Sequence, residues 1–137
     1  MRRPAAGRPL TELIPVCALP GHPRLAAQPL VVVAFCAQWC GTCRDFQPLL
    51  QRVASAHPDI VFSWADIEDD AEFVGDIEVD TFPTLALIRE GRVLHFGATL
   101  PLEAVLTRLL QTLLQAGHAQ PGIAAEVATF AGALRHG

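Results

Sequence analysis

The feature that most constrains this chain is a run of seven apolar residues, Leu30–Cys36, which leads within four residues into a pair of cysteines. A β-branched run that is apolar on both faces is typical of a central strand in a parallel sheet. After Cys40 and Cys43, apolar residues recur at helical spacing and predict an amphipathic helix through Phe46, Leu49, Leu50 and Val53. Pro48 lies inside this helix and predicts a kink, because it removes one amide donor and clashes with the preceding turn.

The sequence Cys40-Gly41-Thr42-Cys43 indicates redox or metal chemistry. Cysteines one turn apart at the start of a helix meet the ~5–6 Å between Cα atoms that a disulfide requires. Free amides and the helix dipole favour a thiolate at Cys40, so we expect Cys40 to be the nucleophile and Cys43 to resolve the mixed disulfide. A zinc site built from Cys36, Cys40, Cys43 and a histidine is the alternative. Because a second CxxC motif and paired histidines at ligand spacing are missing, we predict no metal site.

The remaining pattern predicts an α/β fold whose mixed central sheet is flanked by helices. Strand–helix–strand units require right-handed crossovers, which place helices on both faces of the sheet. We expect an edge strand within 11–16, a strand over 60–65, a short helix from Asp70 to Gly75, a hairpin of 85–88 with 93–96, and a helix through 102–114.

The chain ends are predicted to lie outside this domain, which we place at residues 10–116. Residues 1–9 are rich in Pro, Ala and Arg, and we expect a disordered arm there. Residues 117–137 form an extension in which Ile123, Val127, Phe130 and Leu134 predict a weak amphipathic helix. Since termini are commonly poorly ordered, the favoured interpretation is a loosely docked or frayed tail.

The composition predicts one folded domain and limits its partners. The 137 residues are 51% hydrophobic and 18% charged, which excludes a disordered chain. A net charge of -4 predicts no nucleic-acid partner. The sequence contains no lysine, which rules out Schiff-base chemistry. No run approaches ~20 apolar residues, so we predict no membrane span. The N-terminus lacks the apolar region of a signal peptide, so we expect a cytoplasmic protein. We also expect the protein to be a monomer.

Four anchors in residues 30–116 resemble the thioredoxin family. They are the run Val33–Cys40 with the dithiol, the helix proline Pro48, the sequence Phe82-Pro83-Thr84, and Gly97. The resemblance implies a thioredoxin-like three-layer sandwich and a cis peptide bond before Pro83, which would face the dithiol. It also implies a substrate-binding patch formed by Trp39, Phe82, Pro83 and Gly97, where a substrate strand pairs with the Phe82 backbone.

The function implied by the resemblance is reduction of protein disulfides. Cys40 attacks a substrate disulfide, Cys43 resolves the mixed disulfide, and the two form the active-site disulfide. A reductase or a small thiol then restores the dithiol, and no bound cofactor is needed. The alternative is a redox-weak thioredoxin-like adaptor or chaperone that binds clients through the apolar patch around Trp39 and Pro83.

The chain departs from the family at four positions. Ala34 stands where the family usually has a buried Asp. The family also has a lysine that pairs with this Asp, and the corresponding position in this chain is near Trp64, so both members of the pair are missing. We therefore expect slower resolution by Cys43. Thr42 replaces a proline, and Cys36 replaces a tryptophan. We interpret Cys36 as a small buried hydrophobe, with a third redox thiol that pairs with Cys40 or protects it as the alternative.

Overall fold

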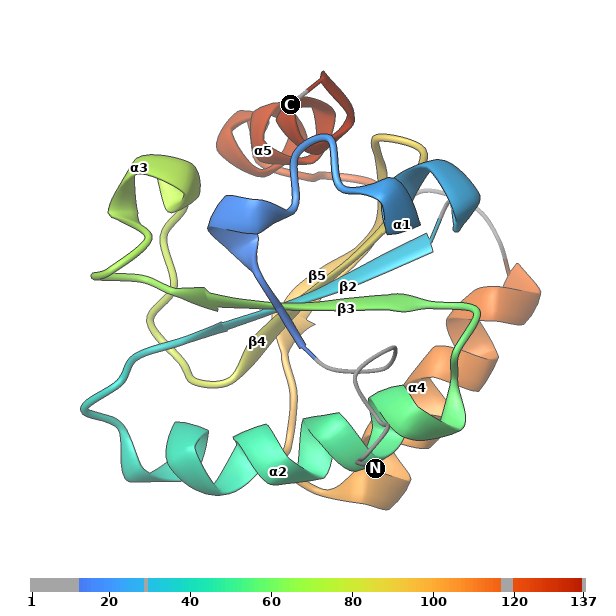
Figure 1. Cartoon of the computed structure of the whole chain (residues 1–137). Helices are drawn as coiled ribbons and strands as arrows, with labels where there is room; N and C mark the ends of the chain where they lie inside the picture. The colour runs from blue at the N-terminus through green and yellow to red at the C-terminus, as the bar shows by residue number, and fades with distance from the viewer. Residues whose placement is uncertain (1–12, 29, 117–119, 137) are drawn as a thin grey trace, which may run out of the picture.

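A twisted five-stranded sheet forms the centre of the protein in the computed structural model, which describes residues 13–28, 30–116 and 120–136 (Figure 1). The predicted arm at residues 1–9 lies outside the described residues. The strand order is β1-β3-β2-β4-β5. The strands are β1 (Ile14–Pro15), β2 (Leu30–Cys36), β3 (Val61–Asp66), β4 (Thr84–Arg89) and β5 (Arg92–Ala98).

The sheet is mixed, as expected. β3 pairs in parallel with β1 and β2, whereas β4 pairs antiparallel with β2 and β5. All seven residues of β2 are buried, because β2 is the central strand and both of its faces are covered. The predicted hairpin is β4–β5, whose turn contains Glu90 and Gly91, both with positive φ.

Helices cover both faces and make the fold a three-layer sandwich. Figure 1 shows α2 (Gly41–Ala56) and α4 (Glu103–Ala116) on one side of the sheet. The other side carries α1 (Pro23–Ala27), α3 (Ala71–Val74) and α5 (Ala125–His136), together with the short 3-10 helix η2 (Val16–Ala18). Within the described ranges, no helix combines the length and apolar character that a membrane crossing requires.

Alternation along β2 divides the core into two clusters. One cluster lies between the sheet and the helices α3 and α5, and β2 contributes Val31, Val33 and Phe35 to it. The other lies between the sheet and the helices α2 and α4, and β2 contributes Leu30, Val32 and Ala34 to it. This is the period of two expected for a strand, in which successive side chains point to opposite faces. The same alternation places Cys36, the last residue of β2, on the α2 side.

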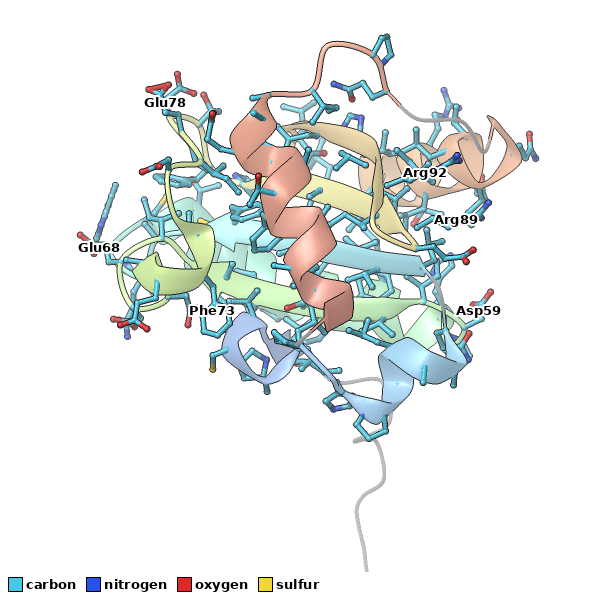
Figure 2. The ribbon with its side chains drawn as sticks, turned by 90° about the horizontal axis from the view of Figure 1, so that it is seen from above. Asp59, Glu68, Phe73, Glu78, Arg89 and Arg92 are labelled. Carbon is cyan, nitrogen blue, oxygen red and sulfur yellow. A yellow bond between two sulfur atoms is a disulfide. The ribbon has the colours of Figure 1, made fainter. Side chains whose placement is uncertain are left out.

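The C-terminal helix α5 is part of the core, which differs from the interpretation of this segment as a loosely docked tail. A helix forms as predicted, although Ile123 precedes it, and its apolar residues Val127, Phe130 and Leu134 are 3–5% exposed. The Phe130 ring lies 5.4 Å from that of Phe35. Gln120 also ties the segment to β5, since its backbone N–H donates to the Val93 carbonyl and its side-chain oxygen accepts from the Phe96 N–H. Figure 2 shows α5 lying across the sheet.

Candidate active site

Cys40 is the N-cap residue of α2, as the sequence predicts. Its backbone is extended and its carbonyl accepts the first helical hydrogen bond, from the Arg44 N–H at 3.2 Å. The Cys40 N–H donates to the Ala37 carbonyl at 3.0 Å, which closes the turn between β2 and α2. The thiol is free and half-exposed. The Cys40 sulfur therefore lies at a helix N-terminus, where the backbone dipoles favour negative charge.

Cys43 lies one turn further along α2 and forms a disulfide with Cys36. The Cα atoms of these two residues are 5.8 Å apart. This pairing differs from the expected active-site disulfide between Cys40 and Cys43, and it also differs from the interpretation of Cys36 as a small hydrophobe. Two local patterns explain it: Cys36 ends β2 on the side facing α2, and Cys43 begins the buried stripe of α2 that continues through Phe46 and Leu50.

The sequence holds only part of the signal for this pairing, because periodicity gives the faces on which Cys36 and Cys43 lie but does not choose between Cys36 and Cys40. The alternation of β2 and the helical spacing after Cys43 together predict that both sulfurs face the same interface. The roles expected for Cys36 were those of a buried hydrophobe, a partner or protector of Cys40, or a zinc ligand, and a disulfide with Cys43 was not among them. The other cysteine, Cys17, lies in η2 as an exposed free thiol.

The loop before β4 meets the loop before α2. The Phe82–Pro83 peptide bond is cis, and Pro83 is buried. The Thr84 hydroxyl donates to the Thr81 carbonyl at 2.7 Å, and the Thr99 N–H donates to the Pro83 carbonyl at 3.0 Å. The ring of Trp39 stands edge-on to that of Phe82. The structure thus brings together Trp39, Phe82 and Pro83.

Gly97, the fourth residue of the expected substrate patch, lies in β5 opposite Leu85 of β4. A Cβ atom added at Gly97 would meet the His95 ring at 3.6 Å, which is an ordinary contact.

The Nε2 atom of His95 is buried without a hydrogen-bond partner. Burial also lowers the pKa of His95 below its usual 6.5, because desolvation disfavours the charged ring.

A groove of about 390 Å³ lies beside Cys43. Its lining includes Cys43, Arg44, Trp64, Asp66 and Asp70. Asp66 is 7% exposed, and its carboxylate accepts hydrogen bonds from the backbone N–H groups of Glu68 and Asp69, each at 2.9 Å. The Asp70 carboxylate accepts from the Asp66 N–H at 2.8 Å. These two carboxylates therefore hold the loop after β3 in place.

Other acids of the same stretch extend into solvent. Glu68 and Glu78 are exposed, and Figure 2 shows both at the same edge of the molecule. Among the described residues, no group of three or more His, Cys, Asp or Glu side chains is arranged to hold a metal ion.

Two of the four positions at which the chain departs from the family pattern, Ala34 and Trp64, are neighbours in the sheet. Ala34 of β2 is the register partner of Trp64 of β3. Ala34 is fully buried, and the half-buried Trp64 ring lies 6.5 Å from that of Phe46. An apolar contact thus occupies this part of the interface between the sheet and α2.

Comparison with known proteins supports one family. A family model described as Thioredoxin matches residues 23–110. Putative thioredoxin 2 of Streptomyces coelicolor is 38% identical over 60 residues, which are 44% of this chain and 45% of that protein. Thioredoxin of Chlamydia pneumoniae is 32% identical over 84 residues, which are 61% of this chain and 82% of that protein. The match to the first of these relatives thus spans less than half of that relative's length.

Solved structures agree with the architecture. Thioredoxin from Trypanosoma brucei brucei has a TM-score of 0.62 at 24% identity, with 84% of this chain and 99% of that chain covered, and supports the fold. Thioredoxin of Fasciola hepatica has a TM-score of 0.55 at 28% identity, with 66% of this chain and 84% of that chain covered. On the family match, which covers more than half of its residues, this chain belongs to the thioredoxin family.

Proposed function

We propose that this protein is a thiol–disulfide oxidoreductase that reduces protein disulfides through Cys40 and Cys43. The observation that carries the proposal is the free, half-exposed Cys40 thiol at the N-terminus of α2, one turn before a second cysteine. The cis-proline loop next to Trp39 supports it, since an exposed apolar surface beside the nucleophile suits a polypeptide substrate.

The reaction proceeds by two exchanges. The Cys40 thiolate attacks one sulfur of the substrate disulfide, a mixed disulfide forms, and the other substrate sulfur leaves as a thiolate. The Cys43 thiolate then attacks the Cys40 sulfur, which releases the substrate dithiol and leaves the Cys40–Cys43 disulfide. A reductase or a small thiol returns two electrons, and we expect the reducing cytoplasm as the compartment.

The docking of substrate is assigned to Trp39, Phe82, Pro83 and Gly97. An extended substrate segment would lie along the loop before β4 and pair with the Phe82 backbone, as in β-strand addition. Trp39 is 62% exposed and offers a large apolar contact beside Cys40.

Reduction of insulin disulfides with dithiothreitol as the electron source tests this proposal. We expect wild-type protein to accelerate the reaction, Cys40→Ser to abolish the acceleration and Cys43→Ser to stop multiple turnover. Cys17→Ser is the matched control, because it removes an exposed thiol in η2. Equal rates for wild type and Cys40→Ser would overturn the proposal.

The alternative is an adaptor or chaperone that binds clients through the apolar patch around Trp39 and Pro83. One observation favours it: Cys43 is bonded to Cys36 and is then unavailable to resolve a mixed disulfide. In that case insulin is not reduced, whereas Trp39→Ala weakens the binding of an unfolded, cysteine-free client protein.

A further inference from the structure

The Cys36–Cys43 disulfide lies in the interface between the sheet and α2, away from solvent. Cys36 is fully buried and Cys43 is 1% exposed. Cys36 follows Ala34 on the face of β2 that packs against α2, and Cys43 precedes Phe46 on the face of α2 that packs against the sheet. The two sulfurs therefore meet because strand and helix periodicities both direct them into one interface.

Cys40 and Cys36 are alternative partners for Cys43. Cys40 precedes Cys43 by one helical turn, a separation compatible with a disulfide at a helix start. Cys36 holds Cys43 in the structure, and Cys40 is then a free thiol with access to solvent. Cys43 thus has two candidate partners, the buried Cys36 and the half-exposed Cys40.

We propose that Cys36 is a third redox-active residue, which exchanges with Cys40 for Cys43 and leaves the oxidised protein with a free nucleophile. This inference rests on the proposed function, because that reaction produces the Cys40–Cys43 disulfide from which the exchange begins.

The exchange is balanced and needs no external oxidant. The Cys36 thiolate attacks the Cys43 sulfur, the Cys36–Cys43 bond forms, and the Cys40–Cys43 bond breaks. Cys40 leaves as a thiolate, and the proton released by Cys36 is taken up by Cys40 or by solvent. One disulfide and one thiol are present before and after the step, so the protein remains two electrons oxidised.

The oxidised protein then acts on disulfides without reducing them. Cys40 attacks a mispaired disulfide in a protein substrate, and a second thiolate of the substrate displaces Cys40 from the mixed disulfide. The substrate changes its pairing, and Cys40 is regenerated. The substrate class for this form is therefore a protein that carries both a mispaired disulfide and a free thiol.

Chymotryptic mapping of the oxidised protein tests the pairing. In a Cys17→Ser background the protein is reduced, reoxidised with excess insulin, quenched in acid, and alkylated in urea. Cleavage after Phe35, Trp39 and Phe46 separates Cys36 from the other two cysteines. We expect the peptide 36–39 linked to the peptide 40–46, with Cys40 alkylated. The matched control Cys36→Ala gives an internal disulfide within 40–46 and no alkylation there.

The reduction assay separates the two proposals. Wild type that reduces insulin but shows only the internal Cys40–Cys43 disulfide, with Cys36 alkylated, overturns this inference and leaves the proposed function standing. Wild type that fails to reduce insulin overturns the proposed function itself. The wild-type map decides the pairing even where Cys36→Ala does not fold, because the two pairings give peptides of different mass.

Blocking Cys40 tests the exchange itself. Native alkylation of the oxidised Cys17→Ser protein modifies the free Cys40 and leaves the buried disulfide in place. Since external thiols reach the buried pair through Cys40, we expect glutathione to reduce Cys36–Cys43 at least about tenfold more slowly than in the mock-treated protein. Equal rates with and without alkylation would show that Cys40 takes no part, and the exchange would be wrong.

Discussion

The ring of Trp39 stands edge-on to the ring of Phe82, with centroids 5.6 Å apart and an interplanar angle of 82°. The two residues are far apart in sequence, and their contact joins the loop before the dithiol to the cis-proline loop. The exposed face of Trp39 and the turn at Pro83 therefore form one surface. The proposed docking surface beside Cys40 therefore includes side chains of both loops.

Truncation of this contact is predicted to weaken substrate binding. Truncation of an aromatic side chain in a docking surface commonly costs more than about 1 kcal/mol of binding free energy, so we expect Trp39→Ala to raise the KM for insulin reduction by at least about 5-fold. Circular dichroism should show an unchanged fold, because Trp39 is 62% exposed. The control is Leu102→Ala, which truncates an apolar side chain that is 54% exposed and directly precedes α4. A Trp39→Ala variant with the KM of Leu102→Ala would contradict the assignment of Trp39 to docking.

An acid placed at Ala34 is predicted to destabilise the fold. Ala34 is fully buried, and its neighbour on β3 is Trp64. An ionised carboxylate at position 34 would therefore face a tryptophan rather than a cation at this position of the paired strand. An uncompensated buried charge costs about 3–5 kcal/mol, and we expect Ala34→Asp to lower the free energy of unfolding by that order. Urea denaturation measures the change. Ala34→Asn is the control, because asparagine has the shape of aspartate without its charge. Equal losses in the free energy of unfolding for the two variants would mean that size rather than charge is responsible.

The docking of α5 is predicted to contribute to stability. Phe130 is 5% exposed and contacts the ring of Phe35, which lies in the central strand. Removal of a buried phenylalanine costs about 3–5 kcal/mol, so Phe130→Ala should lower the urea midpoint strongly. Thr129→Ala, on the exposed side of α5, should change the free energy of unfolding by less than about 0.5 kcal/mol. Similar midpoints for the two variants would support the loosely docked tail.

His95 is predicted to make the fold less stable in acid. Burial lowers the pKa of the folded-state ring below the usual 6.5, so the unfolded chain binds the proton more readily. Stability is therefore lost as pH falls below about 6.5, because the unfolded state then carries more protons than the folded state. His95→Gln should remove this part of the pH dependence. Urea denaturation of both proteins at about pH 7.5 and about pH 5.5 measures it. A stability difference between the two proteins that stays constant across this range would argue against the effect.

Local pattern was sufficient for most of the architecture. The apolar run Leu30–Cys36 is β2 with the expected bounds, and the helical spacing after Cys43 is α2 with Pro48 inside it. The hairpin follows from two short apolar runs around Glu90-Gly91. These predictions succeed because strand and helix periods are properties of neighbouring residues.

The candidate site was only partly predictable. Cys40 at the helix N-terminus follows from its position before α2. The partner of Cys43 does not, because Cys36 and Cys40 are both close enough in sequence, and the choice depends on how β2 packs against α2. The sequence also gives no sign that the Asp66 and Asp70 carboxylates accept backbone hydrogen bonds, because these bonds depend on the conformation of the loop after β3.

The sequence by itself determined the order of strands and helices, the central buried strand and the place of Cys40 at the N-terminus of α2, because each depends on spacing along a short segment. Only the tertiary structure decided the Cys36–Cys43 bond, the Trp39–Phe82 contact and the docking of α5 against Phe35. Those three join different elements, and their formation depends on the relative placement of elements in space, which local periodicity does not specify.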